Sequence, residues 1–483
     1  MKLHSAHQAF QNRLNCLVEE SSVGQEVLGV VMARTSQRAP AETTRVEIAA
    51  GNRSARRAVD QREIPQATVS KAVKVLKASG LLENGEKLIM STEGRPLMPL
   101  RLGRGLAIAG VHVEQQGNRP SMITTALVGL DSAVLFADRS DEVPDDDVDM
   151  WQSAARLVHT QVTELMETLD KQRANDGVEP LKLFGVGAEV GAPVFEGNIM
   201  PLPGVHASRT VAFADMLRDL FDDTEQPVPV VVENDVNALA VLAIHEDHYA
   251  EPDLAVVAVF PQGVGGGLVM DGRLRRGGQG KAMEVGHLVV GYAPGDRDPD
   301  TRAETPRLQD APAASVGFDD PCWCGESGHV DTLATPARIA GELGMPFDVA
   351  TALTNVDPRY DRAHGVFKRA GSVLGRAIAH VCNVVNPSKL IVYLPDALAK
   401  ADPETASAAY YRAVKAEIET AFAVVGKPIN SEDDDPAKFL QLRSVPADPE
   451  KAALLGARSA AVCVLESFIE HALRLDACSA KGG

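Results

Sequence analysis

The stretch CWCGESGHVDTLATPARIA at residues 322–340 begins with a dense group of side chains that can bind a metal. Cys322 and Cys324 stand one residue apart, His329 follows, and His287 ends the upstream tetrapeptide EVGH. The chain has only six cysteines in 483 residues, and the CWC spacing is too tight for an ordinary disulfide framework. We therefore expect reduced thiols and a cytoplasmic location.

Outward from this stretch, residues 105–483 alternate short apolar runs with amphipathic helical stretches. This alternation predicts an α/β body with more than one sheet. The run at 296–320 is rich in Pro, Asp and Ala without periodicity, so we expect a flexible surface insertion there, and a solvated loop at 141–149. The expected strands lie within GLAIAGVHV, KLFGVGAEV, PVPVVVEND, LAVVAVFPQGVGGGLVM and SKLIVYL.

Three separated motifs in this body resemble the ROK family, which comprises bacterial sugar kinases and sugar-responsive repressors. They are ENDVNALA at 233–240, GVGGGLVMDGRLRRGGQGKAMEVGH at 263–287, and the opening stretch itself. The resemblance covers roughly residues 105–475 and implies an actin-like, ribonuclease H-like, two-lobed ATPase fold. It implies a first lobe at 105–240, completed by a C-terminal helix at 455–483, and a second lobe at 241–454 that holds a zinc and sugar site.

The resemblance also explains the metal-capable side chains. The family's C-x-C-G-x-x-G-C-x-E cysteines bind zinc together with the histidine of E-x-G-H. Here His329 stands where the third cysteine belongs, and imidazole is as acceptable to zinc as thiolate. The resemblance therefore implies a closed, structural Zn²⁺ site made by His287, Cys322, Cys324 and His329. The alternative is two reduced cysteines with unrelated histidines.

A sugar site is implied beside the zinc. In the family, the glutamate of E-x-G-H contacts sugar hydroxyls, and a carboxylate can accept two hydrogen bonds from neighbouring hydroxyls. The family's closing glutamate is Asp331 here, one methylene shorter, which leaves its contact with a ligand open. The implied ligand residues are Asn234, Asp235, Glu284, His287 and Asp331.

The phosphate-binding elements of the kinases are altered in this chain. The family's kinase signature D-x-G-x-T corresponds to HVEQQ in AGVHVEQQGN at 109–118, so His112 replaces the aspartate and Glu114 the glycine. A glutamate pointed at a triphosphate would crowd and repel it. The Gly-Gly pair expected after the strand near residue 391 is also missing. We therefore expect catalysis to be lost and Asp235, the counterpart of the kinase general base, to be vestigial.

The first 104 residues differ from the body in charge. They hold 16 Lys and Arg residues against 10 Asp and Glu, whereas the rest of the chain holds 32 against 56. A basic head on an acidic body points to a polyanionic partner. The alternative is chance clustering of surface lysines.

The head has the pattern of a winged helix-turn-helix domain over residues 1–104. GQEVLGVVMARTS and TTRVEIAA predict two helices, and QATVSKAVKVLKASG predicts a third with a polar outer face, followed by LLENGEKLIMS as strand, Asn-Gly turn and strand. The basic stretch GNRSARRAVDQR at 51–62 would extend the second helix or touch phosphate. The alternative is a plain amphipathic surface helix. The residues expected to contact DNA are Gln66, Thr68, Ser70, Lys71 and Lys74.

The remaining composition excludes other classes of protein. The opening residues lack the apolar core of a signal peptide, and no apolar run is expected to approach the ~20 residues that span a bilayer. Aromatic residues make up only 4% of the chain, which argues against a base-stacking surface for single strands.

Together these patterns predict a transcriptional regulator, most often a repressor in this branch of the family. A homodimer or dimer of dimers would bind a double-stranded DNA operator, with affinity controlled by a sugar or amino-sugar derivative. Two alternatives stay open: an active ATP-dependent sugar kinase with a DNA-binding head, and a regulator that binds DNA without a ligand. The sequence leaves open the sugar, the operator and the sign of regulation.

Overall fold

The fold is seen in a computed structural model of the chain. It describes residues 10, 15, 25–36, 45–50, 63–85, 99–116, 119–144, 149–201, 209–222, 228–247, 253–290, 322, 324, 327–399, 402, 404–425 and 439–474. The expected insertion at 296–320 and the basic stretch at 51–62 lie outside these residues.

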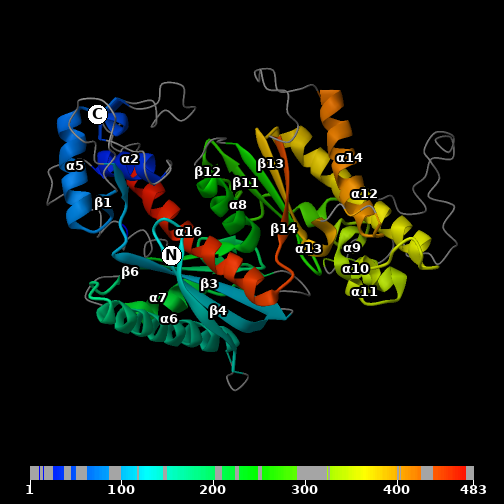
Figure 1. Ribbon diagram of the computed structural model, residues 1–483, viewed down its shortest axis with the longest axis horizontal. Helices are drawn as coiled ribbons and strands as arrows, with labels where there is room; N and C mark the ends of the chain where they lie inside the picture. The colour runs from blue at the N-terminus through cyan, green and yellow to red at the C-terminus, as the bar shows by residue number, and fades with distance from the viewer. Residues whose placement is uncertain are drawn as a thin grey trace.

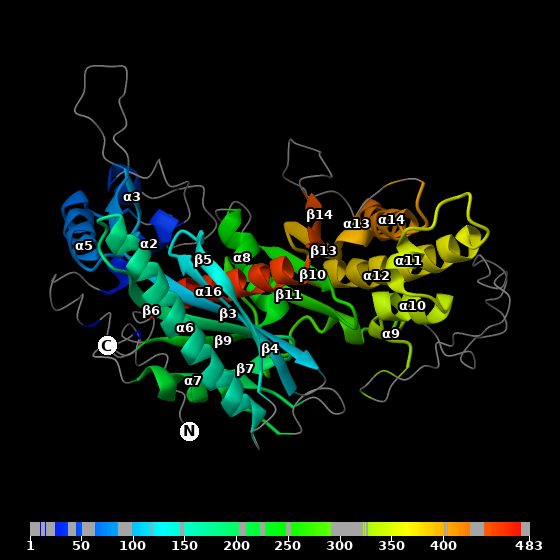
Figure 2. The ribbon, with the colours of Figure 1, turned by 60° about the horizontal axis from the view of Figure 1, so that its bottom comes forward.

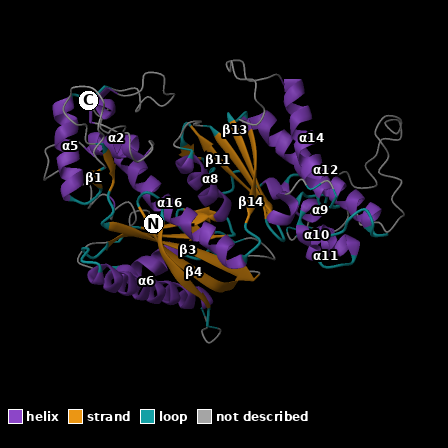
Figure 3. Ribbon diagram, in the orientation of Figure 1, coloured by secondary structure: helices purple, strands orange, loops and turns teal. Residues whose placement is uncertain are grey.

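The first sheet comprises β3 (Leu106–Gln116), β4 (Arg119–Gly129), β5 (Val134–Glu142), β6 (Lys182–Val190) and β9 (Val230–Asn234). Its strand order is β5-β4-β3-β6-β9. Figure 3 shows the strands of this sheet in orange, with β3 and β4 labelled. β3, β6 and β9 run parallel to one another, whereas β4 and β5 join as antiparallel hairpins. The carboxyl ends of the three parallel strands therefore meet at one edge, the usual place for a ligand in an open α/β sheet.

Alternation along β3 determines which helix covers each face of this sheet. Ala109, Val111 and Val113 share a hydrophobic cluster with α6 (Met150–Asn175) and α7 (Phe213–Phe221). Ile108 points the other way and packs with α16 (Pro449–Arg474). The sheet is therefore buried on both faces, with α6 along the outer one (Figure 2).

A second five-stranded sheet has the order β12-β11-β10-β13-β14. α8 (Asp235–Glu246) covers one face, and α12 (Tyr360–Val385) with α14 (Ala408–Val425) covers the other. The strands are β10 (Leu254–Val259), β11 (Val264–Met270), β12 (Arg273–Leu274), β13 (Lys389–Pro395) and β14 (Leu440–Val445). The short elements are β7 (Val194–Phe195), β8 (Asn198–Ile199), η1 (Val285–His287), α9 (Asp331–Ala334), α10 (Pro336–Leu343), α11 (Phe347–Thr351) and α13 (Asp396–Ala399).

α16 packs unusually close to the first sheet, because glycines face it. A Cβ atom on Gly110 would lie 1.9 Å from the carbonyl oxygen of Ala457, and one on Gly187 would lie 2.0 Å from that of Ala460. Real Cβ atoms do not approach so closely. The lack of a side chain at Gly110 and Gly187 therefore lets α16 pack at this short distance from the sheet.

α16 also corrects one expectation. It has a mean hydropathy of 1.6 over its most apolar 18 residues, long and apolar enough to cross a membrane by composition alone. The prediction that no apolar run approaches this length was therefore wrong for residues 449–472. However, 56% of that window is buried against the first sheet, α8 and the head, as in the core helix of a globular protein (Figure 1).

The head contains α2 (Gln25–Ser36), α3 (Arg45–Ala50), α5 (Gln66–Ala78), β1 (Leu82–Asn84) and β2 (Leu100–Leu102). The three helices lie within the segments that the sequence predicts. α5 ends as expected at Gly80, whose φ of +78° is a conformation that favours glycine. Its expected buried face is confirmed, because Val69, Ala72, Val73 and Leu76 are all fully buried.

The β hairpin of the head differs from the expected one. β1 pairs with β2, so that Glu83 lies opposite Arg101, and the Gly85 amide still donates to Pro99 O (2.8 Å). A two-residue Asn-Gly turn would need a left-handed backbone at Gly85, which is not observed. The tight turn was therefore predicted wrongly: the connection is longer, and its residues 86–98 lie outside those described.

The head and the body share one hydrophobic core. The same buried cluster contains Leu28 of α2, Leu76 of α5, and Phe468 and Ile469 of α16. Phe468 stacks edge-on against Phe184 of β6, with ring centroids 5.4 Å apart. Burying one Phe side chain stabilises a fold by about 1.5–3 kcal/mol, so the side chains of this shared cluster help to hold the head against the end of α16.

Candidate metal centre and ligand site

The four metal-capable side chains converge in the second half of the chain. His287 ends η1, and His329 precedes α9. A short antiparallel bridge between Val289 and His329 holds the two segments together, supported by hydrogen bonds from Val290 N to Gly328 O and from Val330 N to Leu288 O (both 3.2 Å). This backbone pairing brings the ligand atoms of His287, Cys322, Cys324 and His329 within 4.8 Å of one another.

The distances within this cluster fit a tetrahedral metal site. The Nδ1 atoms of His287 and His329 are 3.3 Å apart, Cys324 Sγ lies 3.4 Å from His329 Nδ1, and Cys322 Sγ lies 3.8 Å from His287 Nδ1. Zinc bonded at about 2.0–2.1 Å to nitrogen and about 2.3 Å to sulfur would separate two nitrogens by about 3.3 Å and a nitrogen from a sulfur by about 3.6 Å. The Cys₂His₂ set is therefore already arranged as a closed site.

Electrostatics around the cluster suit a cation. Burial, followed by the charges of His329 and Lys281, lowers the pKa of His287, so this imidazole is neutral at pH 7 and offers its lone pair. Burial raises the pKa of the Cys322 thiol to about 11. A metal would displace this proton on binding, as it does at other thiolate sites.

Asn234 and Asp235 lie where β9 passes into α8. Asn234 caps α8, with Oδ1 accepting from the amides of Val236 and Asn237 (both 3.1 Å), while its Nδ2 donates to Ala192 O (3.2 Å) and Asp235 Oδ1 (2.9 Å). Asn234 is therefore the N-cap residue of α8. It also fixes the orientation of the Asp235 carboxyl at the carboxyl edge of the first sheet.

Glu284 and Asp331 form a second group of expected ligand residues. Asp331 Oδ1 accepts a hydrogen bond from the Val264 amide (2.7 Å) and lies directly over Gly286. Burial raises the pKa of Glu284, and the charge of Asp331 raises it further. Asp331 thus ties the metal-bearing segment to the start of β11.

A row of charged residues crosses the first sheet beside Asp235. In register, His112 of β3 pairs with Glu189 of β6, which pairs with Glu233 of β9, so the three side chains share the face under α16. His112 Nδ1 contacts Glu189 Oε1, and a Cβ on Gly456 of α16 would collide with both side chains. The His112 imidazole is therefore paired with a buried carboxylate and packed against α16.

This row shifts the protonation of the groups around it. Burial lowers the pKa of His112, but the charge and hydrogen bond of Glu189 outweigh burial and raise it. Burial raises the pKa of Asp235 to about 7, and the negative charge of Glu189 adds to this, against the hydrogen bond from Val236 N. Asp235 is therefore a carboxyl that titrates near neutral pH.

Sequence reasoning missed three residues of this site: Glu189, Glu233 and Arg276. Glu233 is only 1% exposed; its Oε2 pairs with Arg276 Nε (2.5 Å) and its Oε1 accepts from the Asn237 amide group (3.0 Å). Glu233 raises the pKa of Arg276 further above its ordinary value. A signal existed, because a carboxylate stands inside each of the apolar runs KLFGVGAEV and PVPVVVEND.

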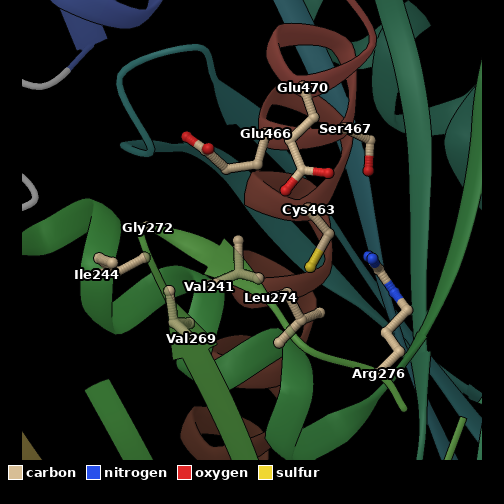
Figure 4. A pocket seen from close by; sticks show the side chains of 10 residues that line it. All are labelled: Val241, Ile244, Val269, Gly272, Leu274, Arg276, Cys463, Glu466, Ser467 and Glu470. Atoms are coloured by element: carbon tan, nitrogen blue, oxygen red, sulfur yellow. The ribbon is translucent and has the colours of Figure 1, made fainter. Parts of the chain in front are cut away.

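A separate small pocket lies between α8, the β11–β12 hairpin and α16 (Figure 4). None of the five expected ligand residues lines it, so it belongs to the packing of these helices rather than to the expected ligand site. Its lining is Val241, Ile244, Val269, Gly272, Leu274, Arg276, Cys463, Glu466, Ser467 and Glu470.

The expected DNA-contacting residues lie on the outer face of α5. Gln66, Lys71 and Lys74 are exposed, and Thr68 and Ser70 are half-buried. Lys77 is turned aside, because its Nζ donates to Asn84 Oδ1 of β1 (2.8 Å). The outer face therefore offers two free-standing ammonium groups with amide and hydroxyl groups between them.

Comparison with known proteins agrees with this geometry. The family model described as "ROK family" matches residues 180–402, which include the Asn234–Asp235 pair and the whole metal cluster. The chain contains a ROK family domain. The matched residues include β6 and β9 of the first sheet and every strand of the second sheet except β14.

Relatives of the ROK domain include kinases. A glucokinase of Halalkalibacterium halodurans is 27% identical over 270 residues, covering 51% of this chain and 72% of the kinase. An N-acetyl-D-glucosamine kinase of Salmonella newport is 22% identical over 256 residues, covering 50% of this chain and 75% of the kinase.

One solved structure extends the fold beyond the ROK domain. It is a crystal structure of a ROK family transcriptional regulator, a homolog of the E. coli MLC protein, with a TM-score of 0.57 and 18% identity. The match covers 92% of this chain and 99% of that one. Residues 105–483 alone cannot supply that share, so the common fold reaches into the head.

Proposed function

We propose that this protein is a DNA-binding transcriptional regulator whose operator affinity is controlled by a sugar bound in a catalytically inactive ROK body. The observation that carries this proposal is a combination of two features. A head with a polar, lysine-bearing outer helix is joined to a ROK body whose phosphate-signature position is filled by the His112–Glu189 pair. The chain would work as a head at 1–104, a first lobe at 105–240 completed by 455–483, and a second lobe at 241–454.

The head binds double-stranded DNA through α5. Gln66, Thr68 and Ser70 stand at its N-terminal end, where recognition helices meet base edges, and Lys71 and Lys74 reach phosphates. The hairpin of β1 and β2 serves as the wing. In a homodimer or dimer of dimers, paired heads would read two half-sites of an operator.

Catalysis is lost because the first phosphate-binding element no longer suits a nucleotide. In the kinase signature the aspartate interacts with the metal ion. Here the His112 imidazole contacts Glu189 and packs against Gly456 instead. Glu114 adds an exposed carboxylate where the signature has glycine. β13 also runs directly into α13 through Pro395, in place of the expected Gly-Gly pair.

His287, Cys322, Cys324 and His329 would hold a structural Zn²⁺ ion. The ion supplies no chemistry, because four protein ligands leave no open coordination position. It fixes the segment that carries Glu284, which is three residues before His287. Asn234, Asp235, Glu284, His287 and Asp331 then surround a sugar or amino-sugar derivative that acts as effector in the cytoplasm.

α16 is the element that would carry the effector's signal to the head. At Gly456 it touches the His112–Glu189 pair, and at Phe468 and Ile469 it forms the core of the head. A ligand that prefers one arrangement of the lobes would therefore shift the position of α16 and the spacing of the two heads.

The test is recovery of bound DNA from sheared genomic DNA by the purified protein, followed by sequencing and salt titration of the best site. We expect a palindromic site whose affinity falls steeply as salt rises. Recovery of no sequence above background would contradict the DNA-binding function of the head.

A second candidate function is an active ATP-dependent sugar kinase with a DNA-binding head. One observation favours it: Asp235 is retained at the start of α8 with a pKa of about 7, suited to a general base. Turnover of ATP with a panel of hexoses would establish this function, and its absence would leave the regulator.

A further inference from the structure

Gln115 has a buried amide group that nothing in the described part of the chain satisfies. Its Nε2 and Oε1 atoms are both shielded from solvent, and neither has a hydrogen-bond partner among the described residues. Leaving such a group unpaired is unfavourable, because it has lost its hydrogen bonds to water. A buried unpaired group therefore needs an explanation, and a bound ligand supplies one.

The backbone aims this amide at the carboxyl edge of the first sheet. The pairing of β3 with β4 shifts register between Glu114 and Gln115, and such bulges re-aim a side chain, often beside a functional site. A Cβ built on Gly191 would lie 3.8 Å from Gln115 Oε1 and 3.5 Å from Asp235 Oδ2. The amide and the carboxyl therefore border the same space beside Gly191.

The charges around this space exclude a further anion. The cations are already used: His112 pairs with Glu189, Arg276 pairs with Glu233, and Lys281 acts on Glu284 and His287. The cation that acts on Asp235 is therefore His112, which is already paired with Glu189. A phosphate dianion placed beside Asp235 would meet the negative charge that Glu189 already places there, and would be repelled in this partly buried site.

We propose that Gln115 is a specificity-determining residue that binds a hydroxyl group of an uncharged sugar, and that this site rejects sugar phosphates. This rests on the proposed function, in which Asn234 and Asp235 bind the effector. A hydroxyl has one donor hydrogen and two acceptor lone pairs, so one sugar hydroxyl can donate to Oε1 while it accepts from Nε2, and a neighbouring hydroxyl of the same sugar can donate to the Asp235 carboxyl. A phosphate dianion has only acceptors and would leave Oε1 unpaired.

The test is calorimetric titration of the full-length protein, without DNA, against neutral hexoses and N-acetylhexosamines and against their 6-phosphates. We expect one or more neutral sugars to bind, and the matching 6-phosphate to bind about 100-fold more weakly or not at all. Tighter binding of the 6-phosphate, or no binding of any neutral sugar, would overturn the proposal.

Two matched variants separate recognition from folding. Gln115→Met keeps the length of the side chain but removes the amide, so we expect roughly tenfold weaker sugar binding together with a higher melting temperature of the free protein. Gln116→Met, on the exposed neighbour, should change neither. Unchanged sugar affinity in Gln115→Met would also refute the role of Gln115.

Operator binding by the same proteins distinguishes the two proposals. If the protein binds its operator but prefers sugar phosphates, only the inference about Gln115 fails. If it binds neutral sugars through Gln115 but no DNA, the regulatory function fails and the specificity of the site stands.

Discussion

At the scale of single residues, two side chains replace features of the family signatures without losing the geometry they serve. His329 stands where a third cysteine is expected, and its Nδ1 still lies 3.3 Å from that of His287. Asp331 is shorter than the expected glutamate, and its carboxylate is committed to the amide of Val264 (2.7 Å). The first change keeps a metal-capable side chain in the cluster, and the second leaves a carboxylate beside Glu284 that also holds the start of β11.

Gly286→Ala tests whether that tie shapes the metal centre. A methyl group there would lie 2.1 Å from Asp331 Oδ1 and 2.5 Å from Val264 O, so the turn carrying Glu284 and His287 must shift. We expect a loss of about 1–3 kcal/mol in the free energy of unfolding and less than one zinc per chain by atomic emission.

Gly278→Ala is the matched control for this variant. A Cβ at Gly278 would meet nothing within 4 Å, so its zinc content and stability should equal those of the wild type. Full zinc occupancy in Gly286→Ala would show that Asp331 does not position the metal-bearing turn.

Asp235→Asn tests the charge balance of the site. The pKa of Asp235 in the folded protein is raised from its ordinary value to about 7, chiefly by burial and then by the charge of Glu189. The contribution of this carboxyl to the free energy of unfolding is therefore fully present at low pH, where it is protonated in both states. That contribution is lost as pH rises through about 7. Asparagine carries no charge, so we expect the variant to gain stability over wild type between about pH 4 and pH 7, and to keep that gain above pH 7.

Urea unfolding of both proteins at pH 5 and pH 8 measures this difference. Both His112 and Glu189 face Asp235 and remain in the variant. A stability difference that is larger at pH 5 than at pH 8 would contradict the raised pKa.

At the scale of elements, α5 shows which part of the head is available to a partner. Five apolar residues of this helix are buried, while Lys71 and Lys74 stay exposed and Lys77 is held by Asn84. The division follows from helical periodicity, but the diversion of Lys77 depends on where β1 passes. Lys71 and Lys74 are therefore the lysines of this helix that are free to meet phosphate.

Lys74→Ala should weaken operator binding without altering folding. Removal of one phosphate contact is expected to lower the slope of log affinity against log salt by about 0.9. Fluorescence anisotropy of a labelled operator over a salt series measures this slope. Lys171→Ala, on an exposed lysine of α6, is the control and should leave it unchanged; equal slopes in both variants would exclude Lys74 as a phosphate contact.

At the scale of the whole molecule, α16 connects parts that are far apart in the sequence. Arg458 Nε donates to Ser132 O in the turn between β4 and β5 (2.8 Å), and its Nη1 pairs with Glu246 at the end of α8 (2.6 Å). Glu246 also pairs with Arg443 of β14 (3.5 Å). One chain of contacts thus runs from the first sheet through α16 and α8 to the second sheet.

Arg458→Gln tests whether these contacts couple sugar binding in the body to operator binding by the head. We expect the change in operator affinity on adding sugar to shrink by about 0.5–2 kcal/mol, because the two sheets would move more independently of α16. The measurement is operator affinity with and without saturating sugar. Lys451→Gln, on the exposed first turns of the same helix, should retain the wild-type response, and an equal response in Arg458→Gln would assign the coupling elsewhere.

The sequence by itself determined the α/β body, the three helices of the head, the inward face of α5 and the four members of the metal cluster. These follow from hydrophobic periodicity and from motifs that lie within short segments, where local chemistry is decisive. The cluster members were predictable because few residue types bind zinc.

Only the tertiary structure decided the remaining features. The row of His112, Glu189 and Glu233 depends on the register of three strands distant in the chain, and the length of the wing depends on the pairing of β1 with β2. α16 packs closely against Gly110 and Gly187 and shares a hydrophobic cluster with the head. Both contacts depend on the packed core. Long-range pairing is not encoded in any local pattern, so these contacts appear only when the whole chain is folded.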